Sequence, residues 1–179
     1  MRGQLTFDAL DPTRSQALFD PSEHYRYWLS RMWDPRLPTV NFIMLNPSTA
    51  DQYQLDPTVT RCLHYARRWG FGSLIVTNIF AYRSTDPKAL YTLADPVGTE
   101  NDAYLRKAAT QANLRVAAWG THGSLRNRHE AVLASLADFA LTALGVTQGG
   151  FPKHPLYLRA DALPAPYPTT STHGPDCSR

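Results

Sequence analysis

Four short apolar segments recur along the chain, and helix-like patterns separate them. They lie at residues 39–45, 74–77, 114–119 and 140–146. Most of the first segment, VNFIML, is apolar without a break, as expected for a strand that is covered on both faces. Strands that alternate with helices at this spacing favour a sheet with helices on both sides. We therefore predict an α/β fold, a three-layer α/β/α sandwich around a short, mainly parallel central sheet.

Helix signals fill the intervals between these segments. Asp56 and Pro57 combine an N-cap carboxylate with a proline at the first helical position. We predict that the helix they begin ends at about Trp69, where Gly70 follows. Two further helices are predicted at residues 100–112 and 125–138.

A pair of strands is expected near the N-terminus. Residues 25–33 and 39–45 are rich in aromatic and β-branched side chains, and a segment with two prolines separates them. This pattern predicts two strands that are joined by a short turn.

Length and composition indicate one domain. With 179 residues, of which 43% are hydrophobic, the chain can bury a sizeable core, which we assign to residues 23–159. Residues 1–22 are polar and are predicted to form an irregular lead-in. Residues 160–179 are rich in Pro, Ser and Thr and are predicted to form a flexible tail.

Composition also bears on compartment and partners. No run of about 18 apolar residues is present, and the N-terminal residues lack a secretory apolar stretch, so no membrane association is expected. Cys62 and Cys177 form no CxxC pair, which favours a reducing cytoplasm. The net charge of +3 is compatible with a polyanionic partner and equally with an ordinary soluble enzyme. No feature indicates an oligomeric state.

Polar side chains follow the predicted strands. The loops at residues 46–51, 78–86 and 153–157 come after the first, second and fourth of them. The carboxyl ends of parallel strands meet at one edge of a sheet, where ligands gather. We therefore expect these loops to build the active site.

Three residues of these loops are predicted to be catalytic. The amide of Asn46 can accept from water while it donates to a substrate, which suits a water-positioning role; an Asx-turn is the alternative. Asp51 can act as a general base or stabilise a cation, or it is a solvated loop acid. His154 can donate to an oxyanion or a phosphate, although a lone histidine is more often a structural hydrogen-bonding group.

Further residues at this edge are predicted to bind the substrate. Asn78 directly follows a strand and can read the edge of a ligand, or it forms a turn. Arg83 and Lys153 can hold phosphate groups, with a salt bridge to Asp86 as the alternative for Arg83. Gly120 opens a turn whose backbone N–H groups can face an anion, although close packing explains a glycine there equally well.

Three aromatic side chains complete the edge: Phe80, Tyr82 and Tyr157. One of them can stack on a nucleic-acid base, a contact of roughly 1–3 kcal/mol. Core packing is the alternative, and it is preferred for Phe80. The His and Cys residues have no metal-site spacing, so neither a metal nor an organic cofactor is expected.

Six ordered blocks resemble an uncharacterised bacterial and phage family that is known only as a domain of unknown function. The blocks are NPSTAD (46–51), DPTVTRC (56–62), TNIFAYRSTDP (77–87), PVGTENDAYL (96–105), AAWGTHG (117–123) and KHPLYL (153–158). The resemblance covers residues 41–158 of the chain.

The layout of the blocks is also distantly similar to the uracil-DNA glycosylase superfamily, especially its mismatch-specific thymine/uracil branch. Asn46, Pro47 and Ser48 match the loop of that branch that holds the water-positioning residue. Residues 70–85 resemble its GxGhTNhhxRxT block, and residues 154–158 resemble its minor-groove loop. The resemblance implies a uracil-DNA glycosylase-like fold and a partner that is single- or double-stranded DNA, or a nucleotide.

The leading hypothesis is a DNA glycosylase-like hydrolase that cleaves the N-glycosidic bond of a flipped, damaged or modified base. Two departures from the superfamily favour a catalytically silent nucleic-acid- or nucleotide-binding module instead. Ser48 stands where the glycosylase loop has glycine, and the last loop lacks the Ser-Pro of the minor-groove loop. Hydrolysis of free nucleotides or nucleosides is a third hypothesis.

Overall fold

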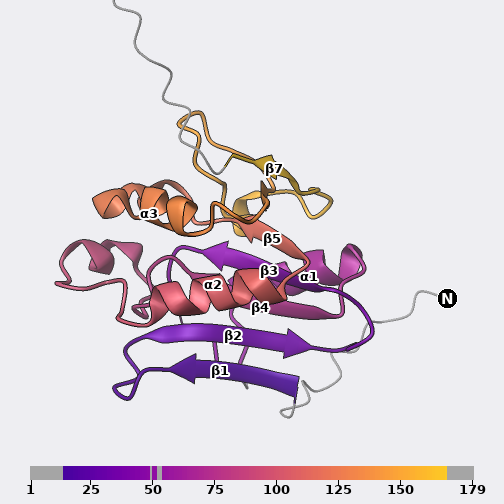
Figure 1. Cartoon of the computed structure of the whole chain (residues 1–179), viewed down its shortest axis with the longest axis horizontal. Coiled ribbons are helices and arrows are strands. Elements are labelled where there is room, and N and C mark those ends of the chain that lie inside the picture. The colour runs from indigo at the N-terminus through magenta and orange to yellow at the C-terminus, as the bar shows by residue number, and fades with distance from the viewer. Residues whose placement is uncertain (1–13, 49, 52–53, 169–179) are drawn as a thin grey trace, which may run out of the picture.

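The computed structural model describes residues 14–48, 50–51 and 54–168, and Figure 1 shows the arrangement of its elements. In these residues, seven strands form one sheet in the order β1-β2-β4-β3-β5-β6-β7. The strands are β1 (Ser15–Phe19), β2 (Arg26–Met32), β3 (Thr39–Met44), β4 (Ser73–Asn78), β5 (Leu114–Ala117), β6 (Leu141–Ala143) and β7 (Ala165–Tyr167). The helices are α1 (Pro57–Arg68), α2 (Asn101–Gln111) and α3 (Arg128–Ser135), with short 3₁₀ helices η2 (Pro87–Tyr91), η3 (Thr121–Asn127) and η4 (Pro155–Tyr157).

The centre of the sheet is parallel and its two sides are antiparallel. β3 pairs in parallel with β4 and β5, and β5 pairs in parallel with β6. On one side β1, β2 and β4 run antiparallel to one another in turn, and on the other side β7 runs antiparallel to β6. The prediction of a mainly parallel sheet is therefore wrong for both flanks, because the described strands form a mixed sheet.

Side chains of β3 alternate between two separate cores, one on each face of the sheet. Phe42 packs on the α1 side, together with Cys62. Ile43 packs on the other side, together with Leu105 of α2 and Val132 of α3. Figure 1 shows α2 in front of the sheet and α1 behind it. The predicted α/β class is confirmed, and helices cover both faces of the sheet.

The predicted pairing of residues 25–33 with residues 39–45 is wrong. Both segments form strands, but β4 lies between them and pairs with each. The segment that joins β2 to β3 therefore crosses the beginning of β4. Its backbone rests there on Gly72, whose carbonyl oxygen accepts from Trp33 N (2.9 Å) and Asp34 N (3.0 Å). Sequence patterns predict which residues form strands. They do not show that a strand from later in the chain, here β4, lies between two earlier ones.

Two strands lie in segments that were predicted to be irregular or flexible. β1 falls within residues 1–22 and β7 within residues 160–179. Both are edge strands, and few of their side chains are buried, so their apolar pattern is weak. β7 is held by its pairing with β6 and by Tyr167, which packs into the core. Residues 1–13 and 169–179 lie outside the described residues.

The helices lie near their predicted positions, and the third is shorter than expected. α1 begins as predicted, because the Asp56 carboxylate accepts a hydrogen bond from Val59 N (2.7 Å). The predicted helix at residues 125–138 is replaced by the end of η3, up to Asn127, and by α3, which begins only at Arg128. Arg126 and Asn127 have left-handed backbone angles (φ 52° and 54°), which interrupt a continuous helix.

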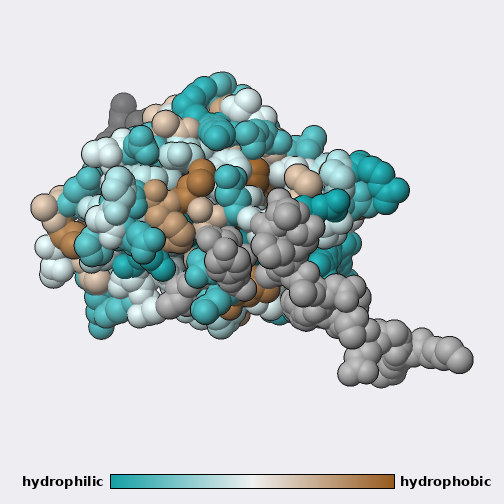
Figure 2. All heavy atoms as spheres, turned by 90° about the horizontal axis from the view of Figure 1, so that it is seen from below, coloured by the Kyte–Doolittle hydropathy of each residue, from teal (hydrophilic) through white to brown (hydrophobic). Residues whose placement is uncertain are grey.

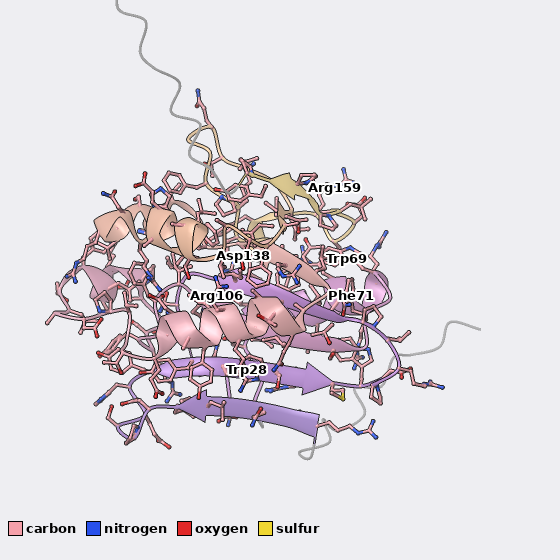
Figure 3. All side chains as sticks on the ribbon, in the orientation of Figure 1. Trp28, Trp69, Phe71, Arg106, Asp138 and Arg159 are labelled. Atoms are coloured by element: carbon pink, nitrogen blue, oxygen red, sulfur yellow. The ribbon has the colours of Figure 1, made fainter. Side chains whose placement is uncertain are left out.

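An ion pair links α2 to the segment that follows α3. Arg106 of α2 lies beside Asp138, at an N–O distance of 3.0 Å (Figure 3). Both side chains are exposed, and an exposed pair contributes only about 0–1 kcal/mol. The buried side chains between these helices and the sheet therefore provide most of the stability of this layer.

Polar residues dominate the surface shown in Figure 2, where hydrophobic residues form small groups. Within the described ranges, no helix has the length and apolar character needed to cross a bilayer.

Gly72→Ala should destabilise the fold, because a methyl group has no room at this position. A Cβ atom there would lie 1.9 Å from Asp34 O and 2.7 Å from Leu37 Cβ. We expect the free energy of unfolding, measured by urea denaturation, to fall by about 1–3 kcal/mol. Gly149→Ala is the control, since its Cβ would meet no atom closer than 3.6 Å. Equal stability of the two variants would contradict the packing described above.

Candidate functional site

A cleft of about 850 Å³ opens at the carboxyl ends of the parallel strands. Its walls come from the segments after β3, β4, β5 and β6, and from the first turn of α1. From β3 the chain passes to β4 on one side, and it returns later to β5 on the other side. Open α/β sheets bind ligands at such switch points, because the loops there diverge and leave a crevice. The cleft therefore lies where this fold favours a site.

Eight of the predicted site residues line this cleft. They are Asn46, Pro47, Ser48, Asn78, Gly120, Lys153, His154 and Tyr157. Four separate segments of the sequence contribute them, and the fold brings these segments together at one edge of the sheet.

Asn46 joins two loops of the cleft. Its Nδ2 donates to Ser84 O (2.9 Å) and to Pro47 O (3.2 Å). Ser84 N in turn donates to Pro47 O (2.9 Å). The amide nitrogen therefore has the structural role that the sequence left open as an alternative. Among the described residues no donor reaches Oδ1, so this oxygen can accept a hydrogen bond from water or a ligand.

Asp56 provides the carboxylate of the cleft, and it is 8% exposed. Its Oδ1 accepts from Val59 N (2.7 Å), and its Oδ2 accepts from Ser48 Oγ (2.6 Å). One side chain thus caps α1 and holds the loop that follows β3. The sequence pattern identifies Asp56 as a helix cap, but it does not show that the cap faces the cleft.

Arg26 is a buried cation in the cleft wall. It is the first residue of β2, and the antiparallel pairing with β4 brings it to the carboxyl edge of the parallel strands. Its side chain is 2% exposed, and Nη1 donates to Ala50 O (2.6 Å). Burial lowers the pKa of Arg26 to about 10, and the nearby Asp56 carboxylate opposes this effect. The guanidinium group therefore stays charged at neutral pH.

His154 caps η4 and is held in one tautomer. Its Nδ1 accepts a hydrogen bond from Leu156 N (3.2 Å). In a neutral ring with Nδ1 as acceptor, the proton lies on Nε2, which is then a donor. Burial lowers the pKa of His154, while the charge of Asp56 acts in the opposite direction. The neutral imidazole can therefore donate from Nε2 at pH 7.

The remaining polar groups differ in what they offer a ligand. Asn78 lies at the end of β4 and is 2% exposed, and its amide nitrogen meets no acceptor in the described part of the chain. Lys153 is exposed and can place its charge at the mouth of the cleft. Gly120 has φ 72°, which favours glycine, and its N–H donates to Pro152 O (2.8 Å). The N–H of Gly120 itself is therefore used within the protein, and anion binding by the other N–H groups of this turn stays a prediction.

Three of the predicted binding residues lie outside the cleft lining. Phe80 is fully buried in the core between the sheet and helices α2 and α3, as the packing alternative predicts. Tyr82 packs edge-on against Tyr25, with ring centroids 5.6 Å apart. The guanidinium group of Arg83 lies over the ring of Phe19, 4.8 Å from its centroid. The contacts of Tyr82 and Arg83 join the segment after β4 to Tyr25, which directly precedes β2, and to Phe19 at the end of β1.

Asp51, a predicted catalytic residue, also lies outside the cleft lining. Its Oδ1 accepts from Gln54 N (2.8 Å), and its backbone carbonyl accepts from Arg31. Asp51 therefore organises its own loop, and Asp56 takes its place as the carboxylate of the cleft. Residues 49, 52 and 53 of this loop lie outside the described residues.

Several residues of the cleft wall are missing from the sequence-based prediction. They are Arg26, Asp56, Ser84, Thr85, Trp119, Thr121, His122 and Thr147, among others. Arg26 lies at the beginning of a strand, whereas only residues that follow strands were expected at this edge of the sheet. Thr121 and His122 follow the third apolar segment, at the edge where the sequence places polar groups, but neither was assigned a role in the site; Trp119 was assigned to the strand itself.

Together these groups can hold a polar ligand and stabilise charge on it. The cleft combines a buried guanidinium group, a carboxylate, a neutral imidazole and two amides. In the residues that the structure covers, no group of three or more His, Cys, Asp or Glu side chains could hold a metal ion.

The family described as "Protein of unknown function (DUF1643)" matches residues 26–156. The chain belongs to this family. The match begins at Arg26 and ends at Leu156, so every residue that lines the cleft falls within it except Tyr157. No curated protein and no solved structure matches the chain. Membership of the family of unknown function is thereby shown, and the similarity to the uracil-DNA glycosylase superfamily stays a prediction.

His154 should make stability depend on pH below neutrality. Its pKa in the folded state lies below the ordinary value of 6.5, because burial disfavours the charged ring. The unfolded chain therefore takes up this proton first, and stability is lost as the pH falls from 6.5 towards the folded pKa. Urea denaturation at pH 7.5 and 5.5 measures the effect, and His154→Asn, which keeps an N-cap acceptor, should lose less stability than the wild type. His64→Asn, at an exposed position of α1, is the control. If the stability of wild type and of His154→Asn depended equally on pH, His154 would not be the group responsible.

Proposed function

We propose that this protein is a DNA glycosylase-like hydrolase, which cleaves the N-glycosidic bond of a damaged or modified base. The observation that carries the proposal is that Asn46, Asn78 and His154, from three separate segments of the chain, line one cleft of about 850 Å³. Ligand pockets of roughly 300–1,000 Å³ hold small molecules, so one nucleotide unit fits. A base in duplex DNA must leave the stack to enter such a cleft, and the partner in this proposal is single- or double-stranded DNA.

In this reaction, water attacks the anomeric carbon of the sugar and loses a proton to solvent, and the base leaves with the electron pair of the glycosidic bond and then takes up a proton from solvent. Asn46 Oδ1 accepts from the water and orients it, while the bonds from Nδ2 to Ser84 O and Pro47 O hold the amide in place. His154 Nε2–H donates to the departing base, where negative charge develops. The neutral state of His154 suits this role because the ring keeps its donor at neutral pH.

Asp56 stabilises the positive charge that develops on the sugar. Its carboxylate lines the cleft, and both of its oxygens are held by donors of the protein. A fixed carboxylate lowers the energy of an oxocarbenium-like transition state by electrostatic attraction, without moving during the reaction. Asp56 replaces Asp51 in this part of the mechanism.

Base recognition falls to Asn78, and the mouth of the cleft contacts the DNA strand. The free amide nitrogen of Asn78 can donate to a carbonyl of the base. Tyr157 is 85% exposed at the mouth, where its ring can stack on a neighbouring base. Lys153 can contact a backbone phosphate. Phe80 and Tyr82 have no part in this proposal, because neither lines the cleft.

A nucleic-acid- or nucleotide-binding module without catalysis is the second candidate, and one observation favours it. The amide nitrogen of Asn46 is fully used by the backbone carbonyls of Pro47 and Ser84. A residue that only closes the loop would make these same bonds.

The compartment in this proposal is the reducing cytoplasm. Cys62 is free and buried in α1, and it is inaccessible to a disulfide partner.

Asn46→Ala should abolish base release with a small loss of stability. The substrates are duplexes and single strands with uracil, mismatched thymine or bulky modified pyrimidines, and the readout is the abasic product. We expect activity to fall by about 10²-fold or more, as for loss of a group that positions the attacking water. The two lost hydrogen bonds should lower the free energy of unfolding by about 1–2 kcal/mol.

Asn113→Ala is the matched control for Asn46→Ala. Asn113 Oδ1 accepts from Thr39 N (2.9 Å) at the opposite edge of the sheet, so its loss also costs a backbone bond. This variant should keep full activity.

Two other results with the wild-type protein would support the alternative functions. Salt-sensitive DNA binding without product would support the binding module. Turnover of monomers alone would support a nucleotide or nucleoside hydrolase.

A further inference from the structure

Arg26 is a buried cation whose hydrogen-bonding capacity is only partly used. Its side chain is 2% exposed, yet it lines the cleft. Its Nη1 donates to Ala50 O, and its Nε is buried with no partner in the residues that the structure describes. A buried donor without a partner costs roughly 1–3 kcal/mol, and more when it is charged. In the described residues, Arg31, Arg61 and Arg83 also have a buried Nε without a partner, but only Arg26 among these four lines the cleft, where a ligand can supply acceptors to the guanidinium group.

Asp56 does not neutralise Arg26 by direct contact. Both oxygens of the Asp56 carboxylate are bonded elsewhere, to Val59 N and to Ser48 Oγ. The carboxylate acts on Arg26 through space only. Within the described part of the chain, Arg26 therefore forms no ion pair, which is unusual for a guanidinium group that is this deeply buried.

Other groups of the cleft add to the positive potential around Arg26. The first turn of α1 contributes Pro57, Thr58 and Val59 to the lining, and the N-terminal end of a helix is electropositive. Lys153 supplies a second cation from the segment after β6.

We propose that Arg26 binds a phosphate group of the ligand inside the cleft. The guanidinium fork matches two oxygens of one phosphate, and a full negative charge compensates a desolvated cation better than the neutral edge of a base can. This inference rests on the proposed function and deepens it. The substrate is a phosphorylated nucleotide unit, and a free base or nucleoside lacks the group that Arg26 binds.

Isothermal titration calorimetry with unmodified ligands tests the site on the wild-type protein. The ligands are inorganic phosphate, 2′-deoxynucleoside 5′-monophosphates, the matching nucleosides, and a short oligodeoxynucleotide without terminal phosphate. We expect the monophosphates to bind at least about tenfold more tightly than the nucleosides. Equal affinity of the two would overturn the proposal. Tight binding of the oligodeoxynucleotide would identify the bound group as a backbone phosphodiester, and weak binding would identify it as a terminal phosphate.

Arg26→Lys and Arg31→Lys form a matched pair of variants. Arg31 also lies on β2, is 1% exposed and donates to a backbone carbonyl of the same loop, that of Asp51, but it does not line the cleft. Arg26→Lys keeps the charge and loses the fork, so monophosphate affinity should fall about tenfold or more while nucleoside affinity stays unchanged. Arg31→Lys should leave both affinities unchanged. An unchanged monophosphate affinity in Arg26→Lys would remove Arg26 from the site.

Failure of this inference can be told apart from failure of the proposed function. Monophosphate binding that depends on Arg26, without any base release, would leave the phosphate site standing and remove the hydrolase. The opposite result is base release that is equally efficient from ligands with and without phosphate and unaffected by Arg26→Lys. It would support the hydrolase and remove the phosphate site.

Discussion

The antiparallel pairing of β2 with β4 is the contact on which the candidate site depends. In a parallel sheet, only residues that follow strands reach the ligand-binding edge. β2 runs the other way, so its first residue, Arg26, reaches this edge together with Asn78 at the end of β4. The pairing also separates β2 from β3 and places the Gly72 backbone under the segment that joins them. A single choice of strand direction therefore brings a cation into the cleft and determines the order of the sheet.

The electrostatics of the cleft follow from how few charges are buried there. Arg26 is held by a backbone carbonyl, and Asp56 by a backbone amide and a hydroxyl, so neither cancels the other through direct contact. Their separation keeps a positive region and a negative region within one cleft. Burial lowers the pKa of His154 and so favours its neutral form, which preserves a donor that carries no charge of its own. Such a cleft can distinguish the parts of a ligand by their charge.

Sequence patterns predicted the local features well and the long-range pairings poorly. Asp56 begins α1, as N-cap chemistry requires, and the apolar segments 39–45 and 74–77 form central strands. Eight predicted site residues reach the cleft, because the residues after parallel strands share one edge. Arg26 escaped prediction because its position depends on strand direction, which residue periodicity does not encode. Tyr82 and Asp51 were misplaced because a loop residue can turn towards the core or its own backbone as easily as towards a ligand.

The loops of the cleft are tied to one another in pairs, and this bears on how a ligand would bind. Ser84 N bonds to Pro47 O, Gly120 N to Pro152 O, and Lys153 N to Gly145 O, so backbone contacts link the segments after β3, β4, β5 and β6. Loops joined in this way lose little further conformational freedom on binding, and binding energy is not spent on ordering them. A polar group held in this manner is also placed for charge that appears later, in a transition state, as electrostatic preorganisation requires. Asn46 lines the cleft while its nitrogen is bonded to the loop backbone, so its amide is held in place before a ligand binds. A structural hydrogen bond from a side chain therefore does not by itself argue against a catalytic role.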